Sequence, residues 1–523
     1  MTAAVTAAEF KAVAVNYAAI APMLVVVAGS LVGVLVEAFA PRRSRHGIQM
    51  ALTTLVLLGA FAAVVVWSRT NQTVTLGGSV VVDGVSVFLM GALLLLAVIS
   101  VLIMGERFGG VGGDAFTPMG ASTPGSNQED IATRAGYATS EVFPLTLFAV
   151  LGMMVFLTAN DLITMFVGLE VLSLPLYVLT GLARRRRLLS QEAALKYFLL
   201  GSFSSAFFLF GSALLYGYAG SSDLKAISTA ISTSSGDLDG LLIPGVVLLL
   251  VGLFFKVGAV PFHSWTPDAY QGAPTPVTGF MAACTKLAAF GVILRVAFVG
   301  VGADRWDWQG GVYAIAVLTM VVGAVLSVTQ TDVKRLLAYS SIAHAGFILV
   351  GVIAFSQAAI GGVMFYLVAY GFATVAAFGL VAMVRQGGSE ASHLSQWAGL
   401  GRNHPVFAAT FSFLLLAFAG IPLTSGFTAK YAAFAPAVAS GAGGALLVVI
   451  AVLASAITAF VYVRLIVLMY FTEVPGDDEV VVVLTPSIGS TVAITAGVAA
   501  TVVLGIVPSF LLEIASNASQ FLL

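Results

Sequence analysis

The chain has 523 residues, of which 59% are hydrophobic and only 9% are charged, and its formal net charge is −1. Soluble globular proteins carry about 25% charged residues, so this composition predicts a protein that lies mostly within a lipid bilayer. A net charge near zero argues against nucleic-acid binding. The single cysteine, Cys284, excludes an internal disulfide and a cysteine-ligated iron–sulfur cluster within this chain.

Apolar segments long enough to cross a membrane follow one another along the whole sequence. A span needs roughly 20 apolar residues, and by that measure we expect about fourteen transmembrane helices. The segments lie at 14–38, 48–67, 84–105, 142–158, 162–182, 196–219, 243–271, 275–300, 310–330, 336–355, 357–384, 405–435, 443–471 and 486–508. The expected fold class is therefore all-α, in a polytopic membrane protein.

The connecting segments differ in their content of lysine and arginine. With an even number of spans both termini lie on one side, and placing them outside puts most basic residues inside. The inner segments then hold Arg42, Arg43, Arg45, Arg107, Arg134, Arg184–Arg187, Lys334, Arg335, Arg385 and Arg402, and the outer segments hold Lys11, Arg69, Lys225 and Arg305. The positive-inside rule favours this orientation, with both termini outside.

Two connections are long enough to have structure of their own. The 106–141 segment is rich in Gly, Ser and Pro, which predicts a flexible, solvated inner loop without chemistry. The 221–241 segment is expected to hold a short surface helix on the outer side. Neither is large enough for a domain that houses a redox centre.

Two long apolar segments carry helix-breaking residues near their middle: Pro261 and Pro267 in one, Pro422 and Gly426 in the other. Proline removes a helical hydrogen bond, so each segment is expected to be broken. Broken helices at membrane depth are tolerated where they are buried in protein or line a wet cavity. An interrupted helix in each half of a chain points to a transport site between repeats, although prolines are also common in membrane helices without such a role.

Four charged residues stand inside otherwise apolar segments: Glu170, Lys256, Lys286 and Lys430. A charge at the bilayer centre costs roughly 2.5–3.5 kcal/mol on insertion scales. Lys256 and Lys430 each accompany one of the helix breaks, so break and charge coincide twice. Ionisable groups spread through a membrane interior predict the movement of protons or cations.

Glu170 and Lys256 both lie near the middle of their spans, so we expect them to be partners. A neighbouring carboxylate stabilises a protonated lysine in an apolar site. Moving the carboxylate closer or further away would therefore load or unload a proton, as a proton relay requires.

His263 and His344 are further candidates for the relay, because histidine titrates near neutral pH. His263 follows Pro261 at a predicted helix break. His344 has Ser340 and Ser341 nearby and could line a hydrated channel, but a packing role is equally compatible with its position.

Other charged residues receive structural interpretations. Arg295 is nine residues after Lys286, on the opposite helix face, and is expected to extend to the outer interface. Asp332, Lys334 and Arg335 are expected to form a solvated cluster at an inner helix end. The run Arg184–Arg187 is expected to act as an orientation signal.

Four segments resemble the antiporter-like proton-pumping subunits of NADH–quinone oxidoreductase, respiratory complex I. They are GLEVLSLPLYVL, GLFFKVGAVPFHSWTPDAYQGAPTPV, KRLLAYSSIAHAGF and GIPLTSGFTAKY. The resemblance covers residues 142–470, and the amino-acid sequences of the first two segments are similar to those of the subunit-N branch. The subunit-M branch has a glutamate where this chain has Lys430. The subunit-L branch carries a long C-terminal lateral helix, which we do not expect here.

The resemblance implies fourteen helices that include two inverted five-helix repeats. It divides the chain into 1–141 with three helices and the inner loop, 142–300 with helices 4–8, 310–471 with helices 9–13, and 486–523 with the last helix. Helices 7 and 12 would be broken.

The resemblance also implies roles for individual residues. Glu170 would match the family's helix-5 glutamate, and Lys256, Lys286 and Lys430 its helix-7, helix-8 and helix-12 lysines. His263 and His344 match motif positions.

The implied function is proton translocation coupled to NADH oxidation and quinone reduction, in a bacterial inner (plasma) membrane. No cofactor is expected in this chain, because FMN, the iron–sulfur clusters and quinone would lie in partner subunits. The partners would be an adjacent antiporter-like subunit and small membrane subunits. A Na⁺/H⁺ antiporter subunit of the same fold is the alternative, and a non-pumping scaffold is a second one.

Overall fold

The computed structural model describes residues 13–108, 113–123, 126–135, 139–234, 239–473 and 481–522. In this described part, twelve helices are long and apolar enough to cross a membrane. The shorter helices Val142–Thr158 and Pro405–Ala419 are also apolar. The all-α, multi-pass fold class is thus confirmed, whereas the count of fourteen spans stays a prediction.

The helices, in chain order, are α1 (Tyr17–Phe39), α2 (Arg42–Ala63), α3 (Gly84–Met104), α4 (Asn127–Arg134), α5 (Val142–Thr158), α6 (Leu162–Thr180), α7 (Arg187–Ala219), α8 (Leu224–Thr233), α9 (Asp239–Val257), α10 (Trp265–Gly272), α11 (Thr275–Phe280), α12 (Lys286–Arg295), α13 (Arg305–Val328), α14 (Val333–Ala354), α15 (Gln357–Met383), α16 (Leu400–Asn403), α17 (Pro405–Ala419), α18 (Ser425–Ala439), α19 (Ala442–Phe471), α20 (Ile488–Ile506) and α21 (Ser509–Asn517). Short π-helical turns extend α2 to Ser68 and flank α12, at Met281–Thr285 and Val296–Gly300.

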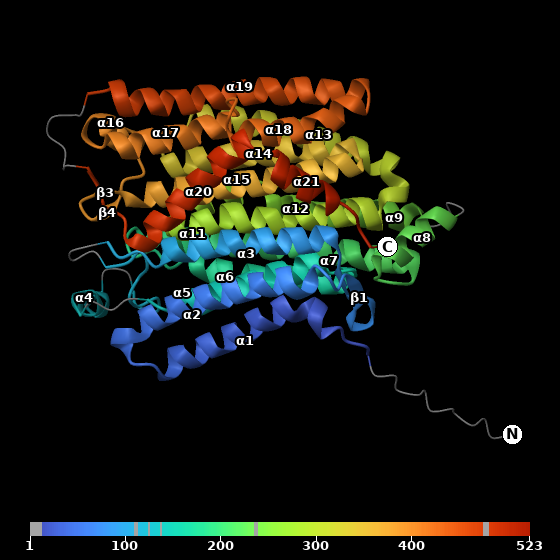
Figure 1. The fold of residues 1–523 in the computed structure, drawn as a ribbon, viewed down its shortest axis with the longest axis horizontal. Coiled ribbons are helices and arrows are strands. Elements are labelled where there is room, and N and C mark those ends of the chain that lie inside the picture. The colour runs from blue at the N-terminus through green and yellow to red at the C-terminus, as the bar shows by residue number, and fades with distance from the viewer. Residues whose placement is uncertain are drawn as a thin grey trace.

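The long helices run side by side, and the chain crosses the molecule from α1 at one edge to α19 at the other (Figure 1). Three spans form the centre, and in each of them 94% of the most apolar 18-residue stretch is buried: Thr275–Gly300, Val333–Ala354 and Gln357–Met383. By contrast, only 28% of the corresponding stretch in Arg42–Ser68 is buried. Because the peripheral helices expose apolar side chains, lipid rather than water is the solvent that suits their outer faces.

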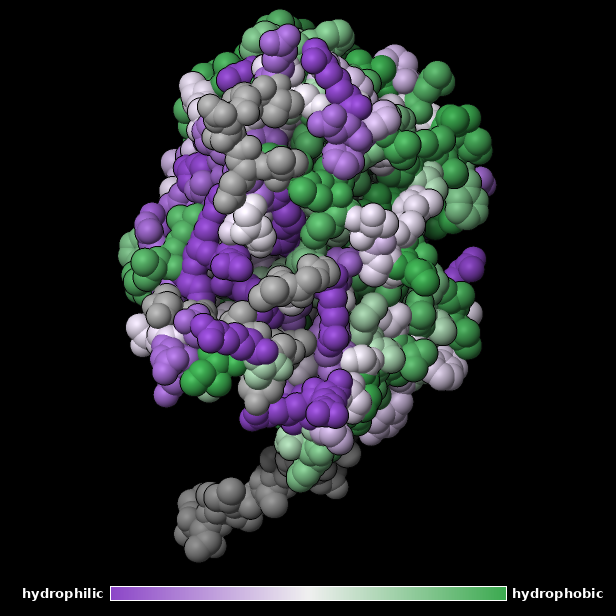
Figure 2. Space-filling view, turned by 90° about the vertical axis from the view of Figure 1, so that its left-hand side faces the viewer, coloured by the Kyte–Doolittle hydropathy of each residue, from purple (hydrophilic) through white to green (hydrophobic). Residues whose placement is uncertain are grey.

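One end of the helix bundle collects arginines at the start of α2, between α6 and α7, after α15 and in α16. We call it the arginine-rich end and define it by Arg42, Arg184–Arg187, Arg385 and Arg402. It lies at the left of Figure 1, and Figure 2 shows hydrophilic side chains gathered on it. Helix α1 begins and helix α21 ends at the opposite end (Figure 1).

Short strands lie at both ends of the bundle. Strands β1 (Thr73–Thr75) and β2 (Val80–Val82) form an antiparallel hairpin before α3. At the arginine-rich end, β3 (Val384–Gln386) pairs antiparallel with both β4 (Ser389–Glu390) and β5 (Val482–Val483). The second sheet therefore ties the end of α15 to the segment before α20.

Both predicted helix breaks are present. Helix α9 ends at Val257, and α10 begins only at Trp265; Gly258 between them has φ +75°. Helix α17 ends at Ala419, and α18 begins at Ser425 after Gly420 with φ +86°. Glycine adopts this left-handed conformation without a steric penalty, so each helix can end there before its proline.

The connecting segments differ in how well they match expectation. The predicted short helix in 221–241 is present as α8. The interpretation of 106–141 as a merely solvated loop is wrong where the structure describes it: Glu106, Asp114 and Phe116 are buried. Asp114 forms an ion pair of 2.9 Å with Arg184, and Glu106 accepts hydrogen bonds from Ser487. Two acidic residues, Glu106 and Asp114, therefore attach this Gly-rich segment to the helix bundle, which its composition did not indicate.

Two expectations for charged residues are also wrong. Arg295 does not extend to an interface; it is 1% exposed and its two terminal nitrogens donate to the two carboxylate oxygens of Asp83, both at 2.9 Å. Lys334 is 1% exposed rather than solvated, and it donates to the Ala273 carbonyl and to Glu390. Asp332 is likewise buried. In each case a partner distant in sequence satisfies the charge, which a single-helix argument does not detect.

Close packing of α5 on α6 depends on glycine. A Cβ atom at Gly152 would lie 2.2 Å from the backbone nitrogen of Leu172 and 2.6 Å from the carbonyl carbon of Val171. We expect Gly152→Ala to separate the helices and lower stability by about 1–3 kcal/mol, the usual cost of overpacking. The measurement is the fraction of protein that survives heating of the membranes. Gly47→Ala is the control, because nothing lies within 4 Å of its added Cβ; equal stability of the two variants would contradict the prediction.

Candidate functional site

Lys256 lies in the last turn of α9, directly before the first helix break. Its side chain is buried, and its Nζ donates to the Ser173 Oγ at 2.8 Å and to the Tyr197 hydroxyl at 3.2 Å. These partners come from α6 and α7 respectively. Three helices thus converge on one ammonium group, and its two hydrogen-bond partners are both neutral.

Glu170 stands one turn before Ser173 on α6. It does not form the expected direct pair with Lys256: no ion pair joins the two residues, although the carboxylate acts electrostatically on the lysine. The Glu170 Oε1 is buried and has no hydrogen-bond partner. Ser173 therefore occupies the position next to Lys256 that sequence reasoning gave to Glu170.

Lys286 begins α12, immediately after the π-helical turn Met281–Thr285. Its buried Nζ donates to the carbonyl of Ser341 and to the Ser341 Oγ, the latter at 2.6 Å. The same nitrogen lies 5.3 Å from the ring centroid of Tyr370, a cation–π distance. π-Helical turns are frequent at functional sites, and here the turn precedes a buried charge.

Lys430 lies in the second turn of α18, after the second break. Its Nζ donates to the carbonyls of Phe418 (3.0 Å) and Ala419 (2.8 Å) and to the Ser455 Oγ (2.6 Å). Phe418 and Ala419 are the last residues of α17, whose carbonyls have no partner within that helix. Breaking the helix thus exposes a negative helix end to a buried cation.

His344 lies on α14, near both Lys286 and Lys430. Its Nδ1 is 2.7 Å from the Tyr366 hydroxyl, and its Nε2 is buried without a partner. Both Lys286 and Lys430 are near enough for their charges to act on the ring. A cavity of about 10 Å³ beside His344, Tyr366 and Ser425 offers room for roughly one water molecule.

The structure therefore brings Lys286, His344 and Lys430 together, and it places Lys256 against α6 and α7. His263 stands apart in the non-helical segment between α9 and α10. It is partly buried, and its ring lies 6.4 Å from that of Tyr339 between centroids. Within the described residues no hydrogen bond or ring contact joins His263 to any of the three lysines.

Sequence reasoning missed the neutral side chains that surround the lysines and His344. Ser173, Tyr197 and Ser455 accept from lysines, the Tyr370 ring faces Lys286, and the Tyr366 hydroxyl contacts His344. The only available signal was local: Ser173 is three residues after Glu170 and so on the same helix face. The tyrosines belong to other helices, and their convergence requires the tertiary fold.

Aromatic residues continue from one lysine toward the next. The Tyr197 ring stacks on Trp265 with centroids 4.5 Å apart. Beyond it, the hydroxyls of Tyr270 and Tyr370 approach Ser341, the partner of Lys286. Titratable nitrogen atoms and hydroxyl groups thus lie close together around Lys286, His344 and Lys430, with one water-sized cavity beside His344. The described residues hold no cluster of His, Cys, Asp and Glu that could bind a metal ion.

Comparison with known proteins gives a consistent result. The family described as NADH:quinone oxidoreductase/Mrp antiporter, TM, matches residues 159–458. The chain is 51% identical to NADH-quinone oxidoreductase subunit N 3 of Streptomyces griseus, over 100% of this chain and 97% of that protein. It is 54% identical to NADH-quinone oxidoreductase subunit N of Salinispora arenicola, over 98% and 99% of the two chains.

Solved structures agree. A chain of respiratory complex I from Thermus thermophilus with bound aureothin has a TM-score of 0.75 and 32% identity, covering 95% of this chain and 99% of that one. A chain of the Mrp complex from a Dietzia species has a TM-score of 0.79 at 21% identity, covering 95% and 96%; this second likeness shows the fold alone. Full-length identity above 50% is decisive, and the chain belongs to the NADH-quinone oxidoreductase subunit N family.

Proposed function

We propose that this chain translocates protons as a membrane-arm subunit of a respiratory NADH–quinone oxidoreductase. The observation that carries the proposal is the series of buried titratable groups Lys256, Lys286, His344 and Lys430, each hydrogen-bonded to hydroxyl or carbonyl groups. Burying these groups costs several kcal/mol apiece, and a scaffold would lose nothing by replacing them. Retaining them is understandable if they bind and release protons.

The finer architecture of the proposal is fourteen spans with inverted repeats at 142–300 and 310–471, flanked by 1–141 and 486–523. Two observations support it. Counting α5 and the α17–α18 pair with the twelve long helices gives fourteen. The helix breaks after Val257 and Ala419 fall in corresponding places in the two repeats, and each accompanies a buried lysine.

The orientation follows from charge. The arginine-rich end faces the inside of the bacterial inner membrane by the positive-inside rule. Both termini then lie on the outer side, since α1 begins and α21 ends at the opposite end of the bundle (Figure 1).

In the proposed mechanism a proton from the inner side loads Lys256, whose ammonium donates to Ser173 and Tyr197. The charge of Glu170 stabilises this protonated state. A movement imposed by an adjacent subunit alters the distance between Glu170 and Lys256, and so changes how tightly the proton is held. The proton then passes to Lys286, through His344 and the adjacent water-sized cavity to Lys430, and leaves on the outer side. His263 is a further candidate carrier at the first break.

Redox chemistry takes place elsewhere in this proposal. FMN, the iron–sulfur clusters and the quinone belong to partner subunits, and the neighbours of this chain are another antiporter-like subunit and small membrane subunits. This chain contributes the positions of its titratable side chains and the exclusion of bulk water from them.

A Na⁺/H⁺ antiporter subunit is the alternative, because the Mrp complex shares the fold. The site argues against it. Hard cations prefer several oxygen ligands that include carboxylates. The buried series consists instead of lysines and a histidine, and among the residues that the structure describes Glu170 is the carboxylate that acts on it.

The test uses inverted membrane vesicles that contain the intact complex. We expect NADH-driven proton uptake that persists when Na⁺ is replaced by choline, because no step in the proposed path binds Na⁺. We also expect the chain to co-purify with flavin and iron–sulfur proteins. Proton movement that requires Na⁺ and proceeds without NADH, in a complex free of flavin, would favour the antiporter instead.

A further inference from the structure

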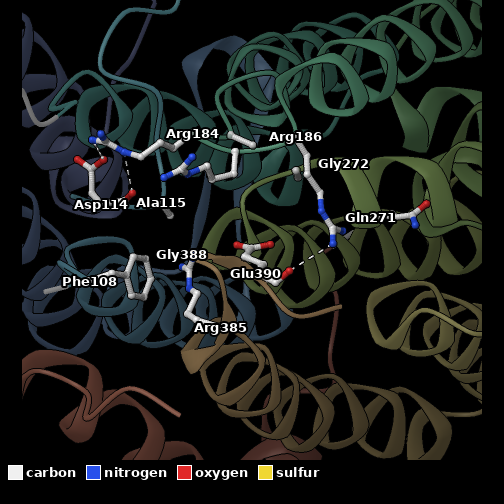
Figure 3. Close-up of a pocket in the computed structure, with 13 residues that line it drawn as sticks. Phe108, Asp114, Ala115, Arg184, Arg186, Gln271, Gly272, Arg385, Gly388 and Glu390 are labelled. Carbon is white, nitrogen blue, oxygen red and sulfur yellow. Dashed lines mark hydrogen bonds and ion pairs between the residues drawn. The ribbon is translucent and has the colours of Figure 1, made fainter. Parts of the chain in front are cut away.

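A small pocket of about 30 Å³ opens at the arginine-rich end, away from the buried lysines. Figure 3 shows the residues that line it, which are Phe108, Asp114 and Ala115 together with residues of the α6–α7 connection, the end of α10 and the β3–β4 hairpin. Its charged lining consists of Arg184, Arg185, Arg186 and Arg385 with Asp114 and Glu390. Positive charge therefore exceeds negative charge around the pocket.

Both carboxylates are already neutralised by other groups. Asp114 pairs with Arg184 at 2.9 Å. Glu390 pairs with the buried Lys334 at 3.2 Å. Burial by itself raises the pKa of Glu390, but Lys334 and Arg385 lower it to about 2, so the carboxylate is ionised.

Three arginines of the lining, Arg185, Arg186 and Arg385, form no direct ion pair with a carboxylate in the described part of the chain, although Glu390 acts on Arg385 electrostatically. Arg186 donates to the Ser392 Oγ at 2.6 Å and to the backbone carbonyl of Glu390 at 3.3 Å, both neutral groups. Arg185 is exposed and close enough to Arg385 for the two like charges to interact.

Arg385 is the most informative of the three. It is 8% exposed, its guanidinium lies 3.6 Å from the ring centroid of Phe108, and its Nε donates to the Ala382 carbonyl. Its Nη2 is buried with no hydrogen-bond partner. Burial lowers the pKa of Arg385, Glu390 raises it, and Arg185 lowers it again. A buried, unpaired guanidinium nitrogen beside a second arginine is costly unless an anion completes the site.

We propose that this pocket binds a phosphate group, held chiefly by Arg385 and Arg185. The planar guanidinium fork matches the oxygens of a phosphate, which it binds through parallel charge-assisted hydrogen bonds. The volume corresponds to roughly two or three water molecules, which suits one small oxyanion. Either the headgroup of an anionic phospholipid or free inorganic phosphate supplies this chemistry.

Occupation of the pocket fixes the β3–β4 hairpin to the α6–α7 connection. The hairpin carries Glu390, which pairs with Lys334 at the start of α14, and α14 also carries Ser341 and His344. The bound anion therefore stabilises the inner end of the helix that holds part of the proposed relay.

Hydrogen–deuterium exchange of the purified, delipidated complex tests the site locally. The complex is placed in phosphatidylcholine nanodiscs, and either phosphatidylglycerol or inorganic phosphate is titrated in. We expect slower exchange in peptides covering residues 183–187 and 384–392. Protection by phosphatidylglycerol alone identifies a lipid headgroup, and protection by inorganic phosphate identifies the free anion.

Variants decide whether the pocket is responsible. We expect Arg385→Gln and the exposed Arg185→Gln each to shift the titration midpoint by about tenfold or more. Arg402→Gln should not shift it, because it removes an equal charge from an exposed position at the same end. The proposal is overturned if neither probe protects these peptides, if all three variants behave alike, or if a neighbouring subunit already shields the peptides in the absence of either probe. Arg185→Gln keeps the test valid if Arg385→Gln does not assemble.

Discussion

Replacing Lys256 with alanine is expected to lower NADH-driven proton uptake by at least about a hundredfold, the lower end of what a positioned proton-transfer group contributes. The side chain is buried, and its two hydrogen-bond partners, Ser173 and Tyr197, are neutral. No carboxylate forms a direct ion pair with Lys256, so we expect the variant to assemble, although Glu170 loses a nearby positive charge. Since proton transfer and electron transfer are coupled in the proposed mechanism, NADH oxidation should fall as well.

The measurement follows proton uptake and NADH oxidation together in inverted vesicles, with the amount of assembled complex determined in parallel. Tyr197→Phe offers a graded comparison, because it removes one of the two hydrogen bonds to Lys256 and should cause a smaller loss. Tyr216→Phe on the same helix is the control, since its side chain is 55% exposed on the surface of α7. Unchanged pumping in Lys256→Ala would show that this residue is not in the relay, and loss of the whole complex would show a structural role.

Hydropathy predicted the membrane helices well because the bilayer imposes a local rule. Each span must satisfy its own backbone hydrogen bonds and present about 20 apolar residues, so it can be detected without knowing its neighbours. The helix breaks were predictable for a similar reason, since proline at 261 and 422 disrupts a helix wherever it packs. The structure adds that Gly258 and Gly420 carry the left-handed turns.

Partners across helices could not be predicted in the same way. Sequence reasoning paired Lys256 with Glu170, because both were the conspicuous charges of their spans. The structure gives Lys256 two neutral hydroxyl partners instead. Serine and tyrosine are too common in membrane helices to attract notice individually, and which of them reach a buried amine depends on helix rotation and depth.

Composition misled where charge was sparse. The 106–141 segment reads as a flexible linker because of its glycines, yet Asp114 anchors it to Arg184. The run Arg184–Arg187 was predicted to act only as an orientation signal for the membrane. In the structure Arg187 is buried and Arg184 forms the ion pair with Asp114. A residue can satisfy the positive-inside rule and still have a specific contact, so the rule does not exhaust its role.

Arg295→Met is expected to destabilise the protein by about 3–5 kcal/mol, the usual cost of leaving one partner of a buried ion pair uncompensated. Arg295 and Asp83 are 1% and 0% exposed, and two parallel hydrogen bonds of 2.9 Å join them. Asp83 also caps α3 through the Ser86 amide, and Phe521 covers the guanidinium with its ring centroid 5.1 Å away. The pair therefore joins the start of α3, the end of α12 and the C-terminal segment.

The measurement is the fraction of complex that remains intact after heating, compared with Arg69→Met, which removes an exposed arginine. The double variant Asp83→Asn with Arg295→Met should recover much of the loss, because asparagine still caps α3 but carries no charge. If the double variant is no more stable than Arg295→Met, the cost does not come from the abandoned carboxylate. If Arg295→Met and the control Arg69→Met leave the same fraction of complex intact after heating, the ion pair adds nothing to stability. The expected result instead makes Arg295 a structural residue, separate in role from Lys286 at the other end of the same helix.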